Sequence, residues 1–278
     1  MEKLTFTTPQ AWKENLGFGC ATLGFANTQE QMVTYDLALE GQVISGTYEK
    51  ILEESRKIGK ADAAIVVFGN AGGENEFLQK LQSTIPCPMV GGGAAFTEKT
   101  GLIPGTSQAA VFFIQDGRYR FETETQCIHT QLVDTCKLIL ADPRSLIAIN
   151  GQDAATYLKE KKAALGLKET DFEHLTLTDE LGVNAHLSCV DGVIKSGRDL
   201  KETMTLRYVP HEVVYERIRS FYDDKNAVIF GCAGLGGLLD KPLYTNNLGL
   251  FLFGEVCTVD GKAEFGNLML SKLRVFAK

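Results

Sequence analysis

The stretch Ala63-Ala64-Ile65-Val66-Val67-Phe68, followed by a glycine-rich loop at residues 69–73, contains the strongest fold signal in the chain. An unbroken apolar run of this length is typical of a strand covered on both faces. Residues 74–83 then have a helical pattern, which prolines end before the short apolar segment Met89-Val90. A strand, a helix and a second strand in this order predict a parallel pair joined by a crossover helix.

Two further pairs of strands are expected to be antiparallel. Residues 109–114 are apolar, residues 119–125 alternate between apolar and polar side chains, and the short polar segment between them predicts a hairpin. Residues 249–258 and 262–276 predict a second, longer hairpin that turns at Asp260-Gly261.

The remaining patterns mix helices and strands without a recognisable linker. For example, a helix over residues 150–165 is expected to be capped by Asn150. We therefore predict an α/β (mixed α+β) fold, in which two β-rich halves with mixed parallel and antiparallel sheets pack closely and helices lie outside. The predicted halves are residues 1–143 and 144–278.

Composition excludes several classes of protein. The 278 residues carry a formal net charge of −7, which argues against a surface for nucleic acid. No apolar run reaches the roughly 18 residues that span a bilayer, and the N-terminal segment lacks the apolar core of a signal peptide. We expect a cytoplasmic protein that neither binds nucleic acid nor inserts into a membrane.

Cysteine and histidine spacing predicts neither a metal site nor a cofactor. The seven cysteines are dispersed and form no C-x-x-C pair, which is typical of buried thiols in a reducing compartment. No two of the four histidines are spaced as ligands on one helix or strand.

Glycine clusters next to apolar runs predict a site built largely from backbone. Glycine lets a ligand approach the main chain closely, and its amides can then donate to that ligand. Ordinary turn chemistry is the alternative explanation for each cluster. The candidate residues in or beside these clusters are Gly19, Cys20, Thr22, Gly91, Gly92, Gly93 and Cys232.

Glu255 is the most informative carboxylate. The strand pattern places it on one face with Phe251 and Phe253, where a charge is costly unless it is paired, protonated or held for a ligand. If the Asp260-Gly261 turn is regular, Glu255 faces Gly266 across the hairpin. A structural carboxylate that accepts backbone amides, or pairs with an arginine, is the alternative.

Together these residues predict a binding site for a zwitterion such as an amino acid. The glycine amides would hold a carboxylate, and Glu255 would hold an ammonium group. Asn267 and Thr22 would add hydrogen bonds, although the register turns Asn267 to the other face unless Gly266 marks a bulge. The alternative function is a cysteine-dependent amidohydrolase or acyltransferase with Cys20 or Cys232 as nucleophile, and we favour the non-enzymatic function.

The order of these motifs resembles the FIST family (F-box and intracellular signal transduction proteins). The N-terminal FIST pattern is matched by Gly19, Cys20, Thr22 and Gly24, and then by Pro88-Met89-Val90-Gly91-Gly92-Gly93-Ala94. The C-terminal pattern is matched by Ile149-Asn150-Gly151-Gln152-Asp153-Ala154, Gly231-Cys232-Ala233-Gly234, Gly254-Glu255 and Phe265-Gly266-Asn267.

This resemblance implies a sensory module that binds small ligands, with amino acids or their derivatives as the proposed class. In the family such modules are often fused to output domains. Because no fused output domain is expected in this chain, the resemblance implies either signalling through a separate protein or a role as a ligand-holding protein.

Overall fold

The computed structural model describes residues 5–7, 20–22, 39–69, 72–93, 106–224, 227–239 and 248–278. Its element order is β1 (Thr5–Thr7), β2 (Cys20–Thr22), β3 (Gly41–Thr47), α2 (Tyr48–Ser55), β4 (Ala63–Phe68), α3 (Glu74–Thr84), β5 (Met89–Gly93), β6 (Gln108–Ile114), β7 (Tyr119–Cys127), β8 (Gln131–Asp142), β9 (Ser145–Ile149), β10 (Gln152–Asp153), α4 (Ala154–Ala164), β11 (Leu175–Thr178), β12 (Asn184–Ala185), β13 (Leu187–Val190), β14 (Val193–Ser196), β15 (Thr203–Tyr208), α5 (His211–Tyr222), β16 (Ala227–Cys232), the 3-10 helix η2 (Ala233–Leu238), β17 (Leu248–Leu252), β18 (Glu255–Val259), β19 (Lys262–Gly266) and β20 (Met269–Ala277). The fold is mixed α and β, as the sequence predicts.

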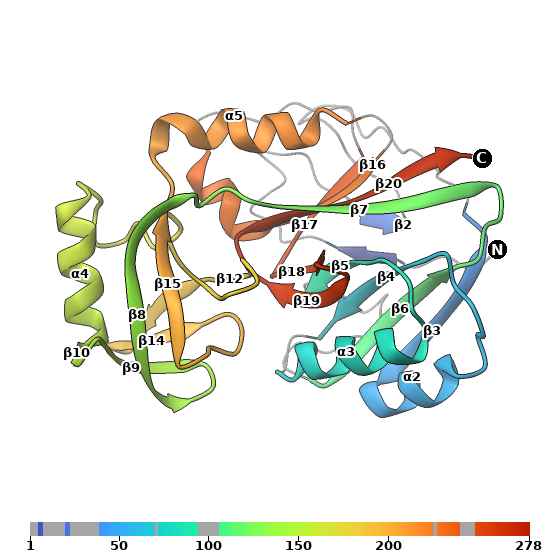
Figure 1. Ribbon diagram of the computed structural model, residues 1–278, viewed down its shortest axis with the longest axis horizontal. Coiled ribbons are helices and arrows are strands. Elements are labelled where there is room, and N and C mark those ends of the chain that lie inside the picture. The colour runs from blue at the N-terminus through green and yellow to red at the C-terminus, as the bar shows by residue number, and fades with distance from the viewer. Residues whose placement is uncertain are drawn as a thin grey trace.

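Two sheets stack face to face and form a sandwich with a helical layer on each outer side (Figure 1). The first sheet has the order β19-β18-β5-β4-β6-β3, and the second has the order β17-β16-β20-β7. Alternate side chains of β4, such as Ile65 and Val67, pack against Phe230 and Leu273 of the second sheet. Helices α2 and α3 cover the outer face of the first sheet, and α5 covers the second (Figure 1).

The predicted strand–helix–strand unit is confirmed, because β4 and β5 pair in parallel around α3. All six residues of β4 are buried, as expected of a strand between two apolar layers. This unit forms the centre of the six-stranded sheet.

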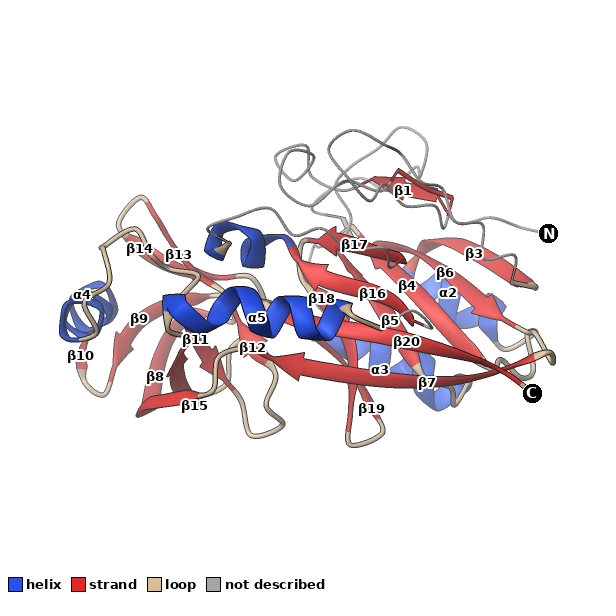
Figure 2. Ribbon diagram, turned by 90° about the horizontal axis from the view of Figure 1, so that it is seen from above, coloured by secondary structure: helices blue, strands red, loops and turns tan. Residues whose placement is uncertain are grey.

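An additional sheet lies beside the sandwich and has the order β12-β11-β15-β8-β9-β14-β13, with β10 paired to β9. The chain crosses from the sandwich into this sheet through the long strands β7 and β8, and α4 covers the far side (Figures 1 and 2). The predicted boundary at residues 143/144 falls in the turn between β8 and β9, so both predicted halves contribute strands to each of the three larger sheets.

Two predicted hairpins need correction. Strand β6 pairs with β3 and β4, whereas β7 pairs with β20, so the expected hairpin between residues 109–114 and 119–125 is wrong. The C-terminal hairpin exists only at its tip, where β18 and β19 meet around Asp260-Gly261. Strands β17 and β20 leave it and pair with the two edges of β16, β17 in parallel and β20 antiparallel.

The helix predicted over residues 150–165 begins later than expected. Its N-cap is Asp153, whose side chain accepts a hydrogen bond from the Thr156 backbone N–H. Asn150 instead adopts a left-handed turn conformation with φ 51°, and Lys137 N–H donates to its side-chain oxygen. The N-cap residue is therefore Asp153, three positions after the predicted Asn150.

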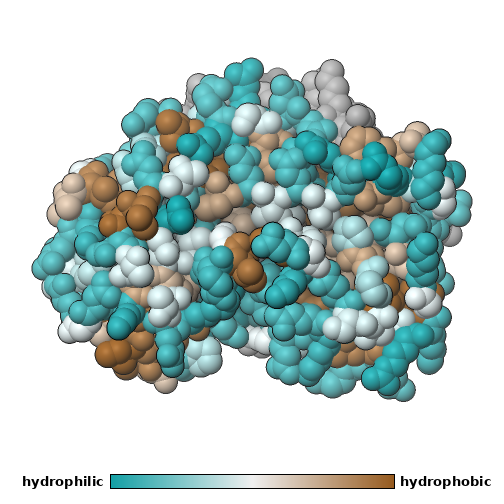
Figure 3. Space-filling view, viewed as in Figure 1, coloured by the Kyte–Doolittle hydropathy of each residue, from teal (hydrophilic) through white to brown (hydrophobic). Residues whose placement is uncertain are grey.

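The surface is mostly hydrophilic, with scattered hydrophobic patches on the face shown in Figure 3. Several exposed apolar side chains, among them Leu132, Ile139 and Ile147, belong to β8 and β9. In the described ranges, no helix combines the length and the apolar character that crossing a membrane requires.

Candidate functional site

A cavity of about 320 Å³ lies where the sandwich meets the additional sheet. Its lining comes from five parts of the chain. Cys232 and Gly234 lie at the junction of β16 and η2, and Phe253 lies between β17 and β18. Asn267 follows β19, His186 lies between β12 and β13, and Gly197 follows β14. Two predicted site residues, Cys232 and Asn267, are therefore brought to one cavity.

Cys232 lies at the centre of several converging backbone groups. The amides of Gly234, Gly254 and Leu268 all hydrogen-bond to its thiol, and these bonds lower its pKa. Burial and the neighbouring Glu255 act more strongly in the other direction and raise the pKa of Cys232 far above its usual range. The residue is therefore a neutral thiol at pH 7, held by a ring of amides.

Glu255 begins β18 and lies directly opposite Gly266, as the sequence predicts, with Gly92 on its other side. Its side chain is completely buried. The Met269 backbone N–H donates to Oε2 over 3.2 Å, while Oε1 has no hydrogen-bond partner. Burial raises the pKa of Glu255 well above its usual range, although the hydrogen bonds from Met269 and from the Cys232 thiol oppose this shift. The carboxyl group is therefore protonated.

This protonation changes the role expected of Glu255. It is not among the residues that line the cavity, and a neutral carboxyl supplies no fixed charge for an ammonium group. Its acceptance of a backbone amide agrees with the structural alternative weighed above. Glu255 is linked to the cavity through the hydrogen bond that it accepts from the thiol of Cys232, a lining residue.

Asn267 occupies the break between β19 and β20. The next residue, Leu268, has φ 53°, so the strand bends immediately after Gly266 and frees Asn267 from strict alternation. Asn267 Oδ1 accepts the His186 backbone N–H over 3.3 Å. A Cβ atom at Gly197 would lie 2.6 Å from Oδ1, and one at Gly254 would lie 2.7 Å from Nδ2. Both glycines are thus needed for the Asn267 side chain to fit.

The predicted role of Gly91, Gly92 and Gly93 is not supported. Strand β5 lies between β4 and β18, and Gly93 N–H donates to Gly254 O over 3.0 Å. These glycines do not line the cavity, and the amide of Gly93 is engaged within the protein. Gly92 lets the backbone at Gly254 approach closely, since a Cβ atom at Gly92 would lie 2.0 Å from Gly254 O.

The N-terminal candidates can be placed only in part. Gly19 lies outside the described residues. Cys20 and Thr22 are the two ends of β2, where they pair with Thr7 and Thr5 of β1. Their role at the cavity stays a prediction.

His186 is the site residue that sequence reasoning missed. Burial lowers the pKa of its imidazole, which is therefore neutral at pH 7. It is separated from Cys232 by more than one strand and one helix in the chain, and no local pattern links the two. Within the described ranges, no group of three or more His, Cys, Asp or Glu side chains is arranged to hold a metal ion.

Replacing Glu255 by glutamine is expected to change how stability depends on pH. A raised pKa in the folded state means that folded protein binds more protons than unfolded protein above the ordinary pKa of 4.5. Stability of the wild type should therefore fall as pH rises from that value towards the folded-state pKa. Glutamine does not titrate, so Glu255→Gln does not lose stability in this way. The free energy of unfolding of Glu255→Gln should therefore rise relative to that of the wild type by about 1.4 kcal/mol per pH unit.

Urea unfolding of both proteins between pH 5 and pH 7 measures this difference, with Glu49→Gln on the exposed side of α2 as the control. Parallel pH profiles for wild type and Glu255→Gln would show that Glu255 is ionised in the folded protein.

No protein-family model matches this chain, and a search of the curated proteins found no match either. The class defined by the structure is a mixed α and β protein with a cavity where its sheets meet.

Proposed function

We propose that this protein binds a small molecule in the Cys232 cavity and acts as a sensory domain. The observation that carries the proposal is the convergence of five chain segments on a cavity of about 320 Å³, a size suited to a metabolite. The order of sequence motifs that resembles the FIST family supports the same function.

The ligand class that we propose is an amino acid or a related metabolite. The neutral imidazole of His186 and the amide of Asn267 offer hydrogen bonds, and Phe253 offers an apolar surface. Glu255 is fully buried and does not line the cavity, so the hydrogen bonds to the ligand would come from His186 and Asn267.

Ligand binding would be coupled to a separate output protein through the position of the cavity between two parts of the fold. Cys232 and Phe253 belong to the sandwich, while His186 belongs to the additional sheet. A ligand that contacts both parts can favour one arrangement of them over another, provided that its affinity for the two arrangements differs.

A cysteine-dependent enzyme is the second candidate, because Cys232 and His186 line the same cavity. A nucleophilic cysteine needs an ionised or readily ionised thiol. Burial and Glu255 keep the Cys232 thiol neutral, which favours binding over catalysis.

The proposed function predicts that one class of small metabolite raises the melting temperature. At 100 times its dissociation constant a ligand adds about 2.7 kcal/mol, which corresponds to roughly 5–10 °C for a chain of this size. The measurement is thermal unfolding against a panel of amino acids and their derivatives. His186→Gln should reduce the shift, whereas His211→Gln, which lies against His174 outside the cavity, should retain it.

Two further results separate the candidates. A sensor should return the ligand chemically unchanged after long incubation, as followed by NMR, and Cys232→Ser should still bind. Conversion of the ligand by wild type but not by Cys232→Ser would establish the enzyme. If no compound shifts the wild-type melting temperature, the proposed ligand class is wrong.

A further inference from the structure

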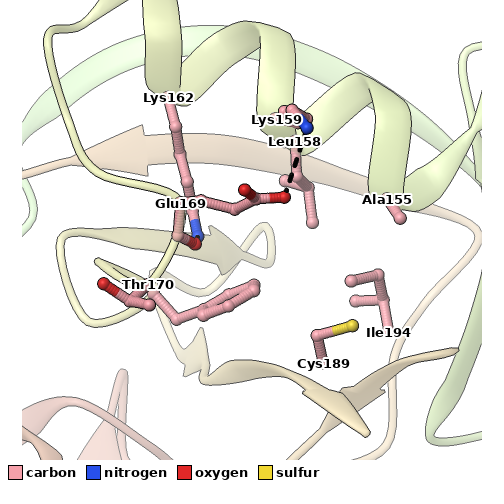
Figure 4. A pocket seen from close by; sticks show the side chains of 9 residues that line it. Ala155, Leu158, Lys159, Lys162, Glu169, Thr170, Cys189 and Ile194 are labelled. Carbon is pink, nitrogen blue, oxygen red and sulfur yellow. Dashed lines mark hydrogen bonds and ion pairs between the residues drawn. The ribbon is translucent and has the colours of Figure 1, made fainter. Parts of the chain in front are cut away.

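A second cavity, of about 190 Å³, lies in the additional sheet beneath α4 and away from Cys232 (Figure 4). Its walls are the inner face of α4, the loop that precedes β11, and the strands β13 and β14. The apolar part of the lining consists of Ala155, Leu158, Phe172 and Ile194.

Lys162 places a cation in this apolar setting. The residue is only 3% exposed, and its Nζ lies 3.1 Å from the centre of the Phe172 ring. Nζ donates one hydrogen bond, over 2.6 Å, to the backbone carbonyl of Glu169. An ammonium group has three donors, so this contact leaves donor capacity unused.

No carboxylate neutralises Lys162 within the part of the chain that the structure describes. The nearby Glu169 side chain instead pairs with Lys159 over 3.4 Å at the rim of the cavity, as the dashed line in Figure 4 shows. Buried charges are normally paired, because an isolated ion loses its hydration without compensation. A buried ammonium group without a counter-ion, beside an apolar cavity, is complementary to an anion with an apolar body.

We propose that this second cavity binds a small carboxylic acid with an apolar tail or ring, whose carboxylate pairs with Lys162. The tail would lie against Leu158, Phe172 and Ile194. This site is separate from the Cys232 cavity, and the proposal does not rest on the function proposed above.

The protonation of Lys162 supports the proposal and makes it testable. Burial lowers the pKa of Lys162 to about 8, while the negative charges of Asp171, Glu173 and Glu169, with Cys189 on β13, oppose that shift. The positive charge of Lys159, also on α4, is paired at the rim. Lys162 is thus largely protonated at pH 7, and a bound carboxylate would favour the ammonium form.

Isothermal titration with hexanoate and benzoate at pH 6.5 tests the proposal. The acid that binds more tightly shows whether the cavity prefers an aliphatic or an aromatic body. Lys162→Met keeps the apolar stem but removes the charge, so it should weaken binding about tenfold or more. Hexanol should bind more weakly than hexanoate by a similar factor. At pH 9 the wild type should bind hexanoate about tenfold less tightly, because most of Lys162 has lost its proton.

Three matched variants complete the experiment. Lys161→Met removes a charge from the same helix, where it pairs with Asp134, and should leave hexanoate affinity unchanged. His186→Gln in the other cavity should also leave it unchanged. Ala155→Leu keeps Lys162 but fills the cavity, and it should abolish binding even if Lys162→Met proves too unstable to study. Equal binding by Lys162→Met, undiminished binding by Ala155→Leu, or no binding of either acid by wild type at millimolar concentration would overturn the proposal.

Discussion

Replacing Gly91 by alanine should destabilise the protein by about 4 kcal/mol or more, enough to prevent folding of a typical domain. A Cβ atom at this position would lie 1.9 Å from the backbone oxygen of Val66. Val66 belongs to the central strand β4, which is buried between two layers of apolar side chains. The main chain there cannot move aside without disturbing the packing on both faces.

Backbone conformation adds to this steric cost. Gly91 has φ +133°, a conformation that residues with a Cβ atom rarely adopt. Gly117→Ala is the matched control, because a Cβ atom there would meet nothing within 4 Å. Its stability should remain within about 0.5 kcal/mol of wild type. Urea unfolding followed by circular dichroism measures both variants, and a folded Gly91→Ala protein within 1 kcal/mol of wild type would contradict the described packing of β4 against β5.

Arg198→Met should cost about 3 kcal/mol, because it removes the buried partner of the Asp179 carboxylate and leaves only the partly exposed Lys201, whose Nζ lies 3.3 Å from Asp179 Oδ2. Arg198 is 1% exposed, and its Nη2 lies 3.1 Å from Asp179 Oδ2. Its Nη1 donates to the backbone oxygen of Val183 over 3.2 Å. The other oxygen of Asp179 accepts the backbone amides of Leu181 and Val183. The pair therefore holds the turn after β11 against the segment after β14.

The exposed pair between Lys80 and Glu76 on α3 provides the control, and Lys80→Gln should change stability by about 0.5 kcal/mol or less. In the double variant Arg198→Met with Asp179→Asn, part of the loss should be recovered, since the buried charge that has lost its arginine is gone. Because Gly197 next to Arg198 lines the Cys232 cavity, Arg198→Met should also weaken a ligand bound there. A cost below 1 kcal/mol for Arg198→Met would show that Asp179 is satisfied without the arginine.

The two cavities differ in how their polar groups are supplied. Around Cys232 the donors are mostly backbone amides, which glycine residues make accessible. Around Lys162 the polar group is a single side chain on an otherwise apolar wall. A ligand of the first cavity should accordingly combine an apolar part with groups that hydrogen-bond to His186 and Asn267, whereas a ligand of the second should combine one charge with an apolar body.

Local patterns in the sequence determined the central unit of this protein. The apolar run of β4, the helix α3 and the short strand β5 follow from periodicity and from proline and glycine positions, since each signal spans only neighbouring residues. The tip of the β18–β19 hairpin follows in the same way from Asp260-Gly261. That turn sets the register, so the position of Glu255 opposite Gly266 could be read from the sequence.

Only the tertiary structure decided how distant strands pair and which side chains meet. Strand β7 pairs with β20 rather than with the adjacent β6, and β16 separates β17 from β20. These choices depend on which apolar faces cover one another across the whole domain, and local periodicity contains no information on this. The same long-range packing brings His186 and Cys232 to one cavity. It also buries Glu255 and Lys162, and burial shifts the pKa of each group towards its neutral form.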